Sequence, residues 1–137
     1  DSIVNDNQGM FLPITRRLHP KICNYISNSF YQSQLEAHQD NLNRKVLYKD
    51  DDISKDISGI NLFEIEHEGC SQSSEEEQFL IKEKIVEILD KGLICQNDSI
   101  RPVKHSDIIV LAPYNSQVNG LSEILSSDIK VGTVDKF

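Results

Sequence analysis

The 137-residue sequence contains no tryptophan, one methionine and few aromatic residues, which make up 7% of it. No stretch approaches the roughly 18 consecutive apolar residues that a membrane helix requires, and no signal peptide pattern opens the chain. The three cysteines, Cys23, Cys70 and Cys95, are odd in number and widely spaced, which indicates neither a disulfide framework nor a zinc site. We therefore expect no membrane contact and a reducing, cytoplasmic location.

Sequence motifs for nucleotide binding and hydrolysis are also absent. Neither Gly-x-x-x-x-Gly-Lys-Ser/Thr nor Gly-x-Gly-x-x-Gly occurs, so the chain cannot by itself cradle a triphosphate in a glycine-rich loop. A Gly-x-Ser-x-Gly elbow and a His-Glu-x-x-His pair are missing too. We expect no ATP hydrolysis by the isolated chain. The histidines lack ligand spacing, so we predict no metal site among His19, His38, His67 and His105.

A net charge of -8 argues against a free-standing nucleic-acid binder, which normally carries a dominant basic patch. The acidic clusters at 50–52 and 75–77 are typical of solvated surface. Hydrophobic residues make up 38% and charged residues 26%, as in a globular protein, and the length suits one domain over 1–137.

The first half of the chain predicts a strand, a helix and a second strand. An apolar segment at 11–14 precedes Pro20, which favours a helix running to Tyr31. Residues 32–58 are polar and predict a long surface excursion, and 60–65 predicts a strand. The helix is expected to bury a stripe made of Ile22, Ile26 and Phe30.

The second half begins with a helix start signal, because Ser73 and Ser74 are each followed three residues later by a glutamate. The helix should end at Lys91-Gly92, where the glycine would provide a left-handed stop. Its apolar stripe consists of Ile81, Ile85, Ile88 and Leu89.

The segment 108–112 then predicts a parallel strand that is buried on both faces. A helix follows, with Val118, Leu121 and Leu125 as its stripe, and a β-rich segment covers 129–134. The alternation of strands and helices predicts an α/β fold built on a parallel sheet.

Three segments carry side chains suited to chemistry. Arg16 and Arg17 precede a helix start, where guanidinium groups and the helix dipole favour phosphate. An exposed arginine pair is also common on solvated surfaces, so both interpretations stay open.

The second segment, 112–117, follows the buried strand and could contact a base or a phosphate oxygen, although helix capping by Asn115 or Ser116 also explains it. The third segment, 131–137, delivers Thr133 and Asp135 to the end of a strand, and taken alone it indicates only a strand and a turn.

In combination, the three segments resemble the second RecA-like domain of superfamily 1B helicases, the group that contains RNA-decay and DNA-replication helicases. The helix-start motif of that family matches Arg17-Leu18-His19-Pro20, followed by Ser27 and Phe30-Tyr31. Its Pro-Tyr motif, with Gln three residues after Tyr, matches Pro113, Tyr114 and Gln117. Its last motif, Val-x-Thr-Val-Asp-x-Phe-Gln-Gly-x-Glu, matches 131–137 as far as Phe137.

The closest resemblance is to bacterial helicases fused to a RecB-like nuclease, on the segments 66–69, 73–76 and 132–137. Many members of the family place Tyr before the motif arginine, where this chain has Arg16, so an aromatic adenine contact is not expected there.

This resemblance implies a three-layer α/β fold with a parallel sheet, of the RecA-like P-loop NTPase type and truncated at its C-terminal end. The parent chain would continue with Gln-Gly-x-Glu. ATP and Mg²⁺ would be bound mainly by a first RecA-like domain elsewhere in that chain. The parent is expected to be a monomeric ATP-dependent helicase that translocates on single-stranded nucleic acid, with DNA favoured over RNA.

The resemblance assigns a role to each matching residue. Arg17 would be the catalytic arginine finger, and the nucleotide cleft would include Arg16, Tyr114, Gln117 and Asp135. Thr133 and Pro113 would contact the single strand. Two other interpretations of the sequence stay open. One is a non-catalytic interaction or receiver-like α/β domain. The other is a phosphohydrolase that uses Asp135, Asp107 and the histidines, which requires clustered carboxylates and a metal.

Overall fold

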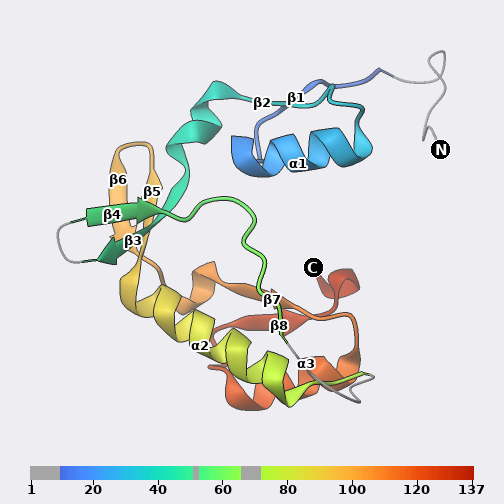
Figure 1. Ribbon diagram of the computed structural model, residues 1–137, viewed down its shortest axis with the longest axis vertical. Coiled ribbons are helices and arrows are strands. Elements are labelled where there is room, and N and C mark those ends of the chain that lie inside the picture. Colours follow the sequence, from blue (N-terminus) through green and yellow to red (C-terminus); the bar gives the residue numbers. More distant parts are fainter. Residues whose placement is uncertain (1–9, 51–52, 66–71) are drawn as a thin grey trace.

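The computed structural model describes residues 10–50, 53–65 and 72–137 of a mixed α/β chain (Figure 1). Its α-helices are α1 (Pro20–Phe30), α2 (Glu75–Lys91) and α3 (Asn115–Ile124). Short 3-10 helices are η1 (Gln39–Asn43), η2 (His105–Asp107) and η3 (Val134–Lys136). The strands are β1 (Ile14–Thr15), β2 (Glu36–Ala37), β3 (Lys45–Asp50), β4 (Ile53–Asp56), β5 (Gly92–Gln96), β6 (Ser99–Pro102), β7 (Ile109–Leu111) and β8 (Lys130–Gly132).

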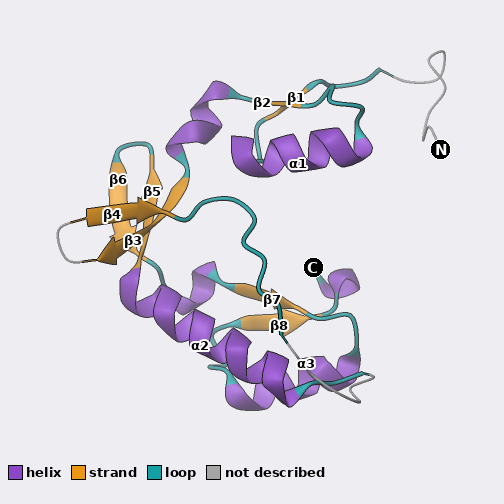
Figure 2. Cartoon of the chain, in the orientation of Figure 1, coloured by secondary structure: helices purple, strands orange, loops and turns teal. Residues whose placement is uncertain are grey.

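The strands form three sheets. β1 pairs with β2 and β7 pairs with β8, both in parallel, and α1 and α3 are the respective crossover helices. Between these two units in sequence lies an antiparallel sheet with the strand order β4-β3-β5-β6. Figure 2 shows the three sheets as separate groups of strands, with α2 and α3 beside the β7–β8 pair.

The predicted α/β class is confirmed, but the described residues do not form one continuous parallel sheet. The antiparallel sheet draws two of its strands from 32–58, which also contains β2 and η1, so this segment, predicted as a surface excursion, contains regular elements that its composition did not indicate. Cross-strand pairing explains the difference, since the Val46-Leu47-Tyr48 run of β3 pairs with Gly92–Ile94 of β5. A polar composition does not reveal a partner 44 or more residues away.

The hairpin β5–β6 closes through Asn97 and Asp98, which have φ values of 48° and 66°. Two consecutive left-handed residues form the kind of tight turn whose twist matches that of antiparallel strands, and Asn and Asp tolerate this conformation well. The two-residue turn therefore sets the register of β5 against β6.

The main core lies on one face of the β7–β8 pair, where Leu121 of α3 is fully buried. Because α2 and α3 both pack on this face, Val110 is buried while Ile109 and Leu111 on the other face are 54% and 52% exposed. The prediction of a strand covered on both faces is therefore wrong, although its parallel pairing is confirmed. The buried members of the core are Ile85, Val110, Ala112, Leu121, Ile129 and Val131.

The start of α1 is confirmed, with Pro20 in the first turn and the His19 side chain as N-cap. Its buried side is made by Cys23 and Ser27, however, and Phe30 is 73% exposed. The predicted stripe is therefore displaced by one residue. Cys23 and Ser27 face the loop before β2, and both contact Leu35.

The start of α2 at the Ser74 cap is confirmed, since Ser74 Oγ accepts a hydrogen bond from the Glu77 amide. The helix ends at Gly92, but this glycine is extended (φ -76°), so the predicted left-handed stop is wrong. A Cβ there would collide with the Ile88 carbonyl and with Val103. Gly92 thus serves close packing where α2 passes directly into β5.

Residues 60–65 do not form the predicted strand, and Ile60, Leu62 and Phe63 are exposed. Alternating apolar residues indicate a strand only when a neighbouring strand can pair with them, and none does so within the described residues. No helix in the described part of the chain is long and apolar enough to span a membrane.

We predict that Leu121→Ala lowers the free energy of unfolding by about 2–5 kcal/mol, because it leaves a cavity at the centre of the α3–sheet contact. Ile124→Ala on the same helix is the control, since Ile124 is already 37% exposed. Urea denaturation of both variants measures the difference. Equal losses would contradict this placement of the core.

Candidate functional site

The turn that carries Arg16 and Arg17 directly follows β1 and leads into α1. Thr15 Oγ1 accepts hydrogen bonds from the Arg17 amide at 3.2 Å and from the Leu18 amide at 3.4 Å. Both arginine side chains are exposed, and neither guanidinium is bonded to any residue that the structure describes. The backbone of the turn is thus fixed while its two cationic groups remain available to a ligand.

His19 closes this turn at the first residue before α1. Its Nδ1 accepts a hydrogen bond from the Lys21 amide at 3.3 Å, so in the neutral ring the proton is on Nε2. Burial lowers the pKa of His19, because the charged ring would lose solvation. The neutral form therefore caps the helix, and the Ile22 and Cys23 amides donate to the His19 carbonyl at 2.9 and 2.8 Å.

Pro113 and Thr133 lie side by side at the carboxyl edge of the β7–β8 pair. Leu111 is in register with Gly132, and the Ala112 amide donates to the Gly132 carbonyl at 3.1 Å. Pro113 and Thr133 each follow the end of this ladder. The parallel register therefore brings together two residues that the sequence assigned to single-strand contact.

Tyr114 and Asp135 extend the same edge. Tyr114 is the residue before α3 and is half exposed, and Asp135 lies exposed in η3. Gly132 permits this close arrangement, since a Cβ there would meet Lys136 and Phe137 at 2.7 and 2.9 Å. The exposed Tyr114 thus follows Pro113 after β7, and the exposed Asp135 lies two residues after Thr133 in η3.

Gln117 has a different position, because its side chain is 4% exposed and joins α3 to the start of α2. Its Oε1 accepts from the Ser74 amide at 2.9 Å and from Ser73 Oγ and Gln78 Nε2 at 3.1 Å. Its Nε2 donates to Glu77 Oε2 at 3.1 Å. Gln117 therefore supports the loop from within the protein, and its polar atoms are already paired.

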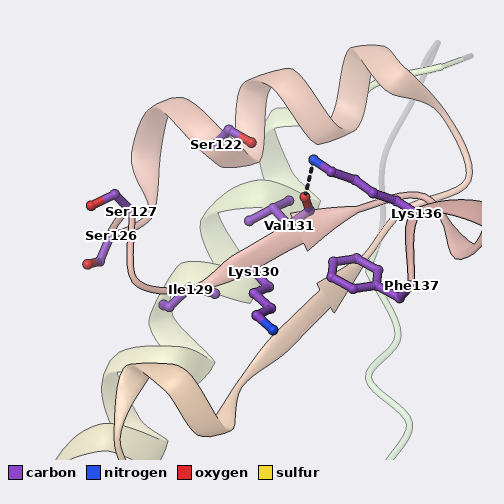
Figure 3. Close-up of a pocket in the computed structure, with 8 residues that line it drawn as sticks. All are labelled: Ser122, Ser126, Ser127, Ile129, Lys130, Val131, Lys136 and Phe137. Carbon is purple, nitrogen blue, oxygen red and sulfur yellow. Dashed lines mark hydrogen bonds between the residues drawn. The ribbon is translucent and has the colours of Figure 1, made fainter.

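A hollow of about 580 Å³ lies beside β8 and the end of α3 (Figure 3). Lys136 Nζ donates to the Val131 carbonyl at 3.4 Å along its wall. Two ammonium groups, three hydroxyls and no carboxylate make this wall suitable for an anionic group such as a phosphate. It is lined by Ser122, Ser126, Ser127, Ile129, Lys130, Val131, Lys136 and Phe137.

The candidate site residues thus form two groups on different sheets. Arg16 and Arg17 follow the β1–β2 pair, whereas the residues at 113–117 and 133–135 belong to the β7–α3–β8 unit (Figure 1). The segment 66–69 lies outside the described residues. Among the described residues, no group of three His, Cys, Asp or Glu side chains could hold a metal ion.

Sequence reasoning missed the side chains that support these groups. Lys130 immediately precedes the third segment and Lys136 lies within it, and their charge could have drawn attention to them. Asn41 and Arg44 reach the arginine turn from a segment that its composition marked as irregular. Only the pairing of β1 with β2 brings that segment to the turn.

We predict that Gln117→Ala lowers the free energy of unfolding by about 1–3 kcal/mol, because the buried Ser74 amide and the Gln78 amide lose their acceptor. Asn119→Ala removes an exposed carboxamide from the same helix and is the matched control. Chemical denaturation compares the two variants. A loss no larger than that of Asn119→Ala would show that the network does not stabilise the protein.

Comparison with known proteins identifies the family. The profile of a family described as "AAA domain" matches residues 2–137, which is nearly the whole chain. No curated protein and no solved structure matches significantly. The matching family consists of helicase-associated domains of the P-loop NTPase type. The chain therefore belongs to the AAA domain family and is a helicase-type domain.

Proposed function

We propose that the chain is the second motor domain of a superfamily 1 DNA helicase and that Arg17 acts as its arginine finger. The observation that carries this proposal is the arginine turn, whose backbone is hydrogen-bonded while both guanidinium groups are unpaired within the described structure. A surface arginine without a function needs no such support. A catalytic arginine needs it, because the charge must already be in place when the reaction begins.

The chemistry assigned to Arg17 is stabilisation of charge in phosphoryl transfer. As ATP is hydrolysed, negative charge spreads over the oxygens of the γ-phosphoryl group and the leaving group. The planar guanidinium offers two parallel N–H donors to such oxygens. Arg16 adds a second positive charge, and the start of α1 adds the positive end of its dipole.

The remaining parts of the nucleotide site belong to a first RecA-like domain in this proposal. That domain would supply the phosphate loop and hold Mg²⁺, which neutralises phosphate charge when bound. This domain would contribute Arg17, Arg16 and the edge residues Tyr114 and Asp135.

The nucleic-acid contact is assigned to the β7–β8 edge. Thr133 offers a hydroxyl and Pro113 a flat apolar surface, next to the hollow that carries Lys130 and Lys136. These groups suit a phosphodiester backbone, which is recognised without regard to base sequence. With a net charge of -8, such contacts must be local.

In this proposal, Asp135 and Gln117 couple the two groups. Asp135 lies in η3, two residues after Thr133, and Gln117 fixes the loop before α3. Closing and opening of the two domains would then drive translocation along single-stranded DNA. We further propose the complete three-layer RecA-like arrangement, a monomeric parent protein in the cytoplasm and a fused nuclease domain, on the strength of the motif resemblance.

In the full-length protein that contains this chain, Arg17→Ala should lower kcat for ATP hydrolysis about a thousandfold. The KM for ATP should change little, because a finger acts mainly on the transition state. Steady-state ATPase assays measure both constants. Arg16→Ala is the matched control, with a smaller loss expected from the same turn, and wild-type turnover by Arg17→Ala would refute the finger.

Thr133→Val should weaken binding of single-stranded DNA about tenfold, because it removes one hydrogen bond to a charged phosphate and keeps the side-chain shape. The factor should be the same for a thymine homopolymer and a mixed sequence, since the contact is to the backbone. Fluorescence anisotropy measures both affinities. Ser29→Ala, which removes an exposed hydroxyl on α1, should leave them unchanged.

A further inference from the structure

The backbone of the arginine turn accepts hydrogen bonds from a segment that lies outside all three motifs. This segment is η1 with its flanking residues, 38–44, which follows β2 directly. The pairing of Thr15 with Ala37 brings the end of β2 beside the end of β1, so the chain enters η1 next to the turn. The His38 amide then donates to the Thr15 carbonyl at 2.9 Å.

Asn41 makes the central contacts of this segment. Its Nδ2 donates to the Thr15 carbonyl at 2.9 Å and to the Leu18 carbonyl at 2.8 Å. These two carbonyls flank Arg16 and Arg17, so one carboxamide spans the turn from end to end. Arg44 adds a third contact, from a guanidinium nitrogen to the Arg16 carbonyl at 3.2 Å.

Asn41 is itself rigidly placed. Asn41 is only 1% exposed. Its backbone amide donates to the His38 carbonyl at 2.9 Å, and its backbone carbonyl accepts from the Arg44 amide at 3.2 Å. A buried polar side chain is retained only where its hydrogen bonds offset its desolvation. Both contacts of Nδ2 meet that condition by fixing the arginine turn.

The chemistry of the site selects asparagine. Two carbonyl oxygens require two N–H donors, which a short carboxamide supplies. Aspartate has the same shape but no donor, serine has one donor, and glutamine is one methylene too long for a fully packed position. The orientation of the amide is settled, because carbonyls can only accept.

We infer that Asn41 is a positioning residue that holds the Thr15–Leu18 turn and thereby sets where the Arg17 guanidinium lies. Two sets of hydrogen bonds then hold the turn. Within the turn, Thr15 Oγ1 accepts from the Arg17 and Leu18 amides, and from η1 the Asn41 side chain donates to the Thr15 and Leu18 carbonyls. The catalytic consequence rests on the proposed role of Arg17, whereas the hold on the turn does not.

The test uses Asn41→Asp in the full-length protein. This change keeps the volume of the side chain and sets carboxylate oxygens against the two carbonyls. Asn43→Asp is the matched control, because it adds the same charge to the same 3-10 helix at an exposed position. We expect Asn41→Asp to lower kcat for ATP hydrolysis about a hundredfold, with the KM for ATP within about threefold of wild type.

Hydrogen exchange measured by mass spectrometry on peptides that cover 14–20 gives a readout independent of activity. Exchange at the Arg17 and Leu18 amides should become faster in Asn41→Asp and stay unchanged in Asn43→Asp. Unchanged exchange in Asn41→Asp would overturn the inference. So would an unchanged kcat in a protein where Arg17→Ala is inactive, or an equal loss of kcat in the control.

The two proposals fail in distinguishable ways. If Arg17→Ala retains wild-type hydrolysis, the finger is refuted, and exchange alone decides whether Asn41 holds the turn. If Asn41→Asp does not fold, Thr15→Val removes the inner acceptor instead and should lower kcat in the same way. Thr15→Ser keeps the hydroxyl and should restore both kcat and slow exchange, and failure of this rescue would overturn the role of the turn.

Discussion

Parallel pairing of strands is the constraint on which the arrangement of this domain depends. Two parallel strands cannot be joined by a tight turn, so the chain must leave one strand end and return to the opposite end of its partner. Here α1 provides that return for β1–β2 and α3 for β7–β8. As a result, the loops that follow β1, β7 and β8 all leave from carboxyl edges, and every candidate site residue outside the helices lies on one of them.

Two buried carboxamides convert these loops into defined structures. Asn41 binds the carbonyls on both sides of the arginine turn, and Gln117 binds the Ser74 amide at the start of α2. Both side chains are almost fully buried, and each joins elements that are distant in sequence. In an environment of low polarity such bonds are strong, and losing one partner leaves the other unsatisfied. The exposed side chains that have a proposed chemical role are therefore positioned by the buried carboxamides of Asn41 and Gln117, which have no chemical role themselves.

The charge of the domain is consistent with a shared site. A strongly acidic chain cannot attract nucleic acid over its whole surface, but Arg16 and Arg17 at one edge and Lys130 and Lys136 near another are local concentrations of positive charge. A second domain that adds its own cations would complete either site.

The sequence by itself determined the parts that depend on neighbouring residues. The starts of α1 and α2 follow from Pro20 and from the Ser74 cap, and the strand–helix–strand order around α3 follows from local apolar periodicity. The candidate positions Arg17, Pro113, Tyr114 and Thr133 were identified from motifs, because those motifs are contiguous. Only the tertiary structure decided that β3 pairs with β5 and that one face of β7 stays exposed. It also decided that 60–65 forms no strand and that the Asn41 side chain contacts the arginine turn. The physical reason is that strand pairing and burial depend on partners tens of residues away, whose approach is fixed by the packing of the whole domain and leaves no periodic signal in the segment itself.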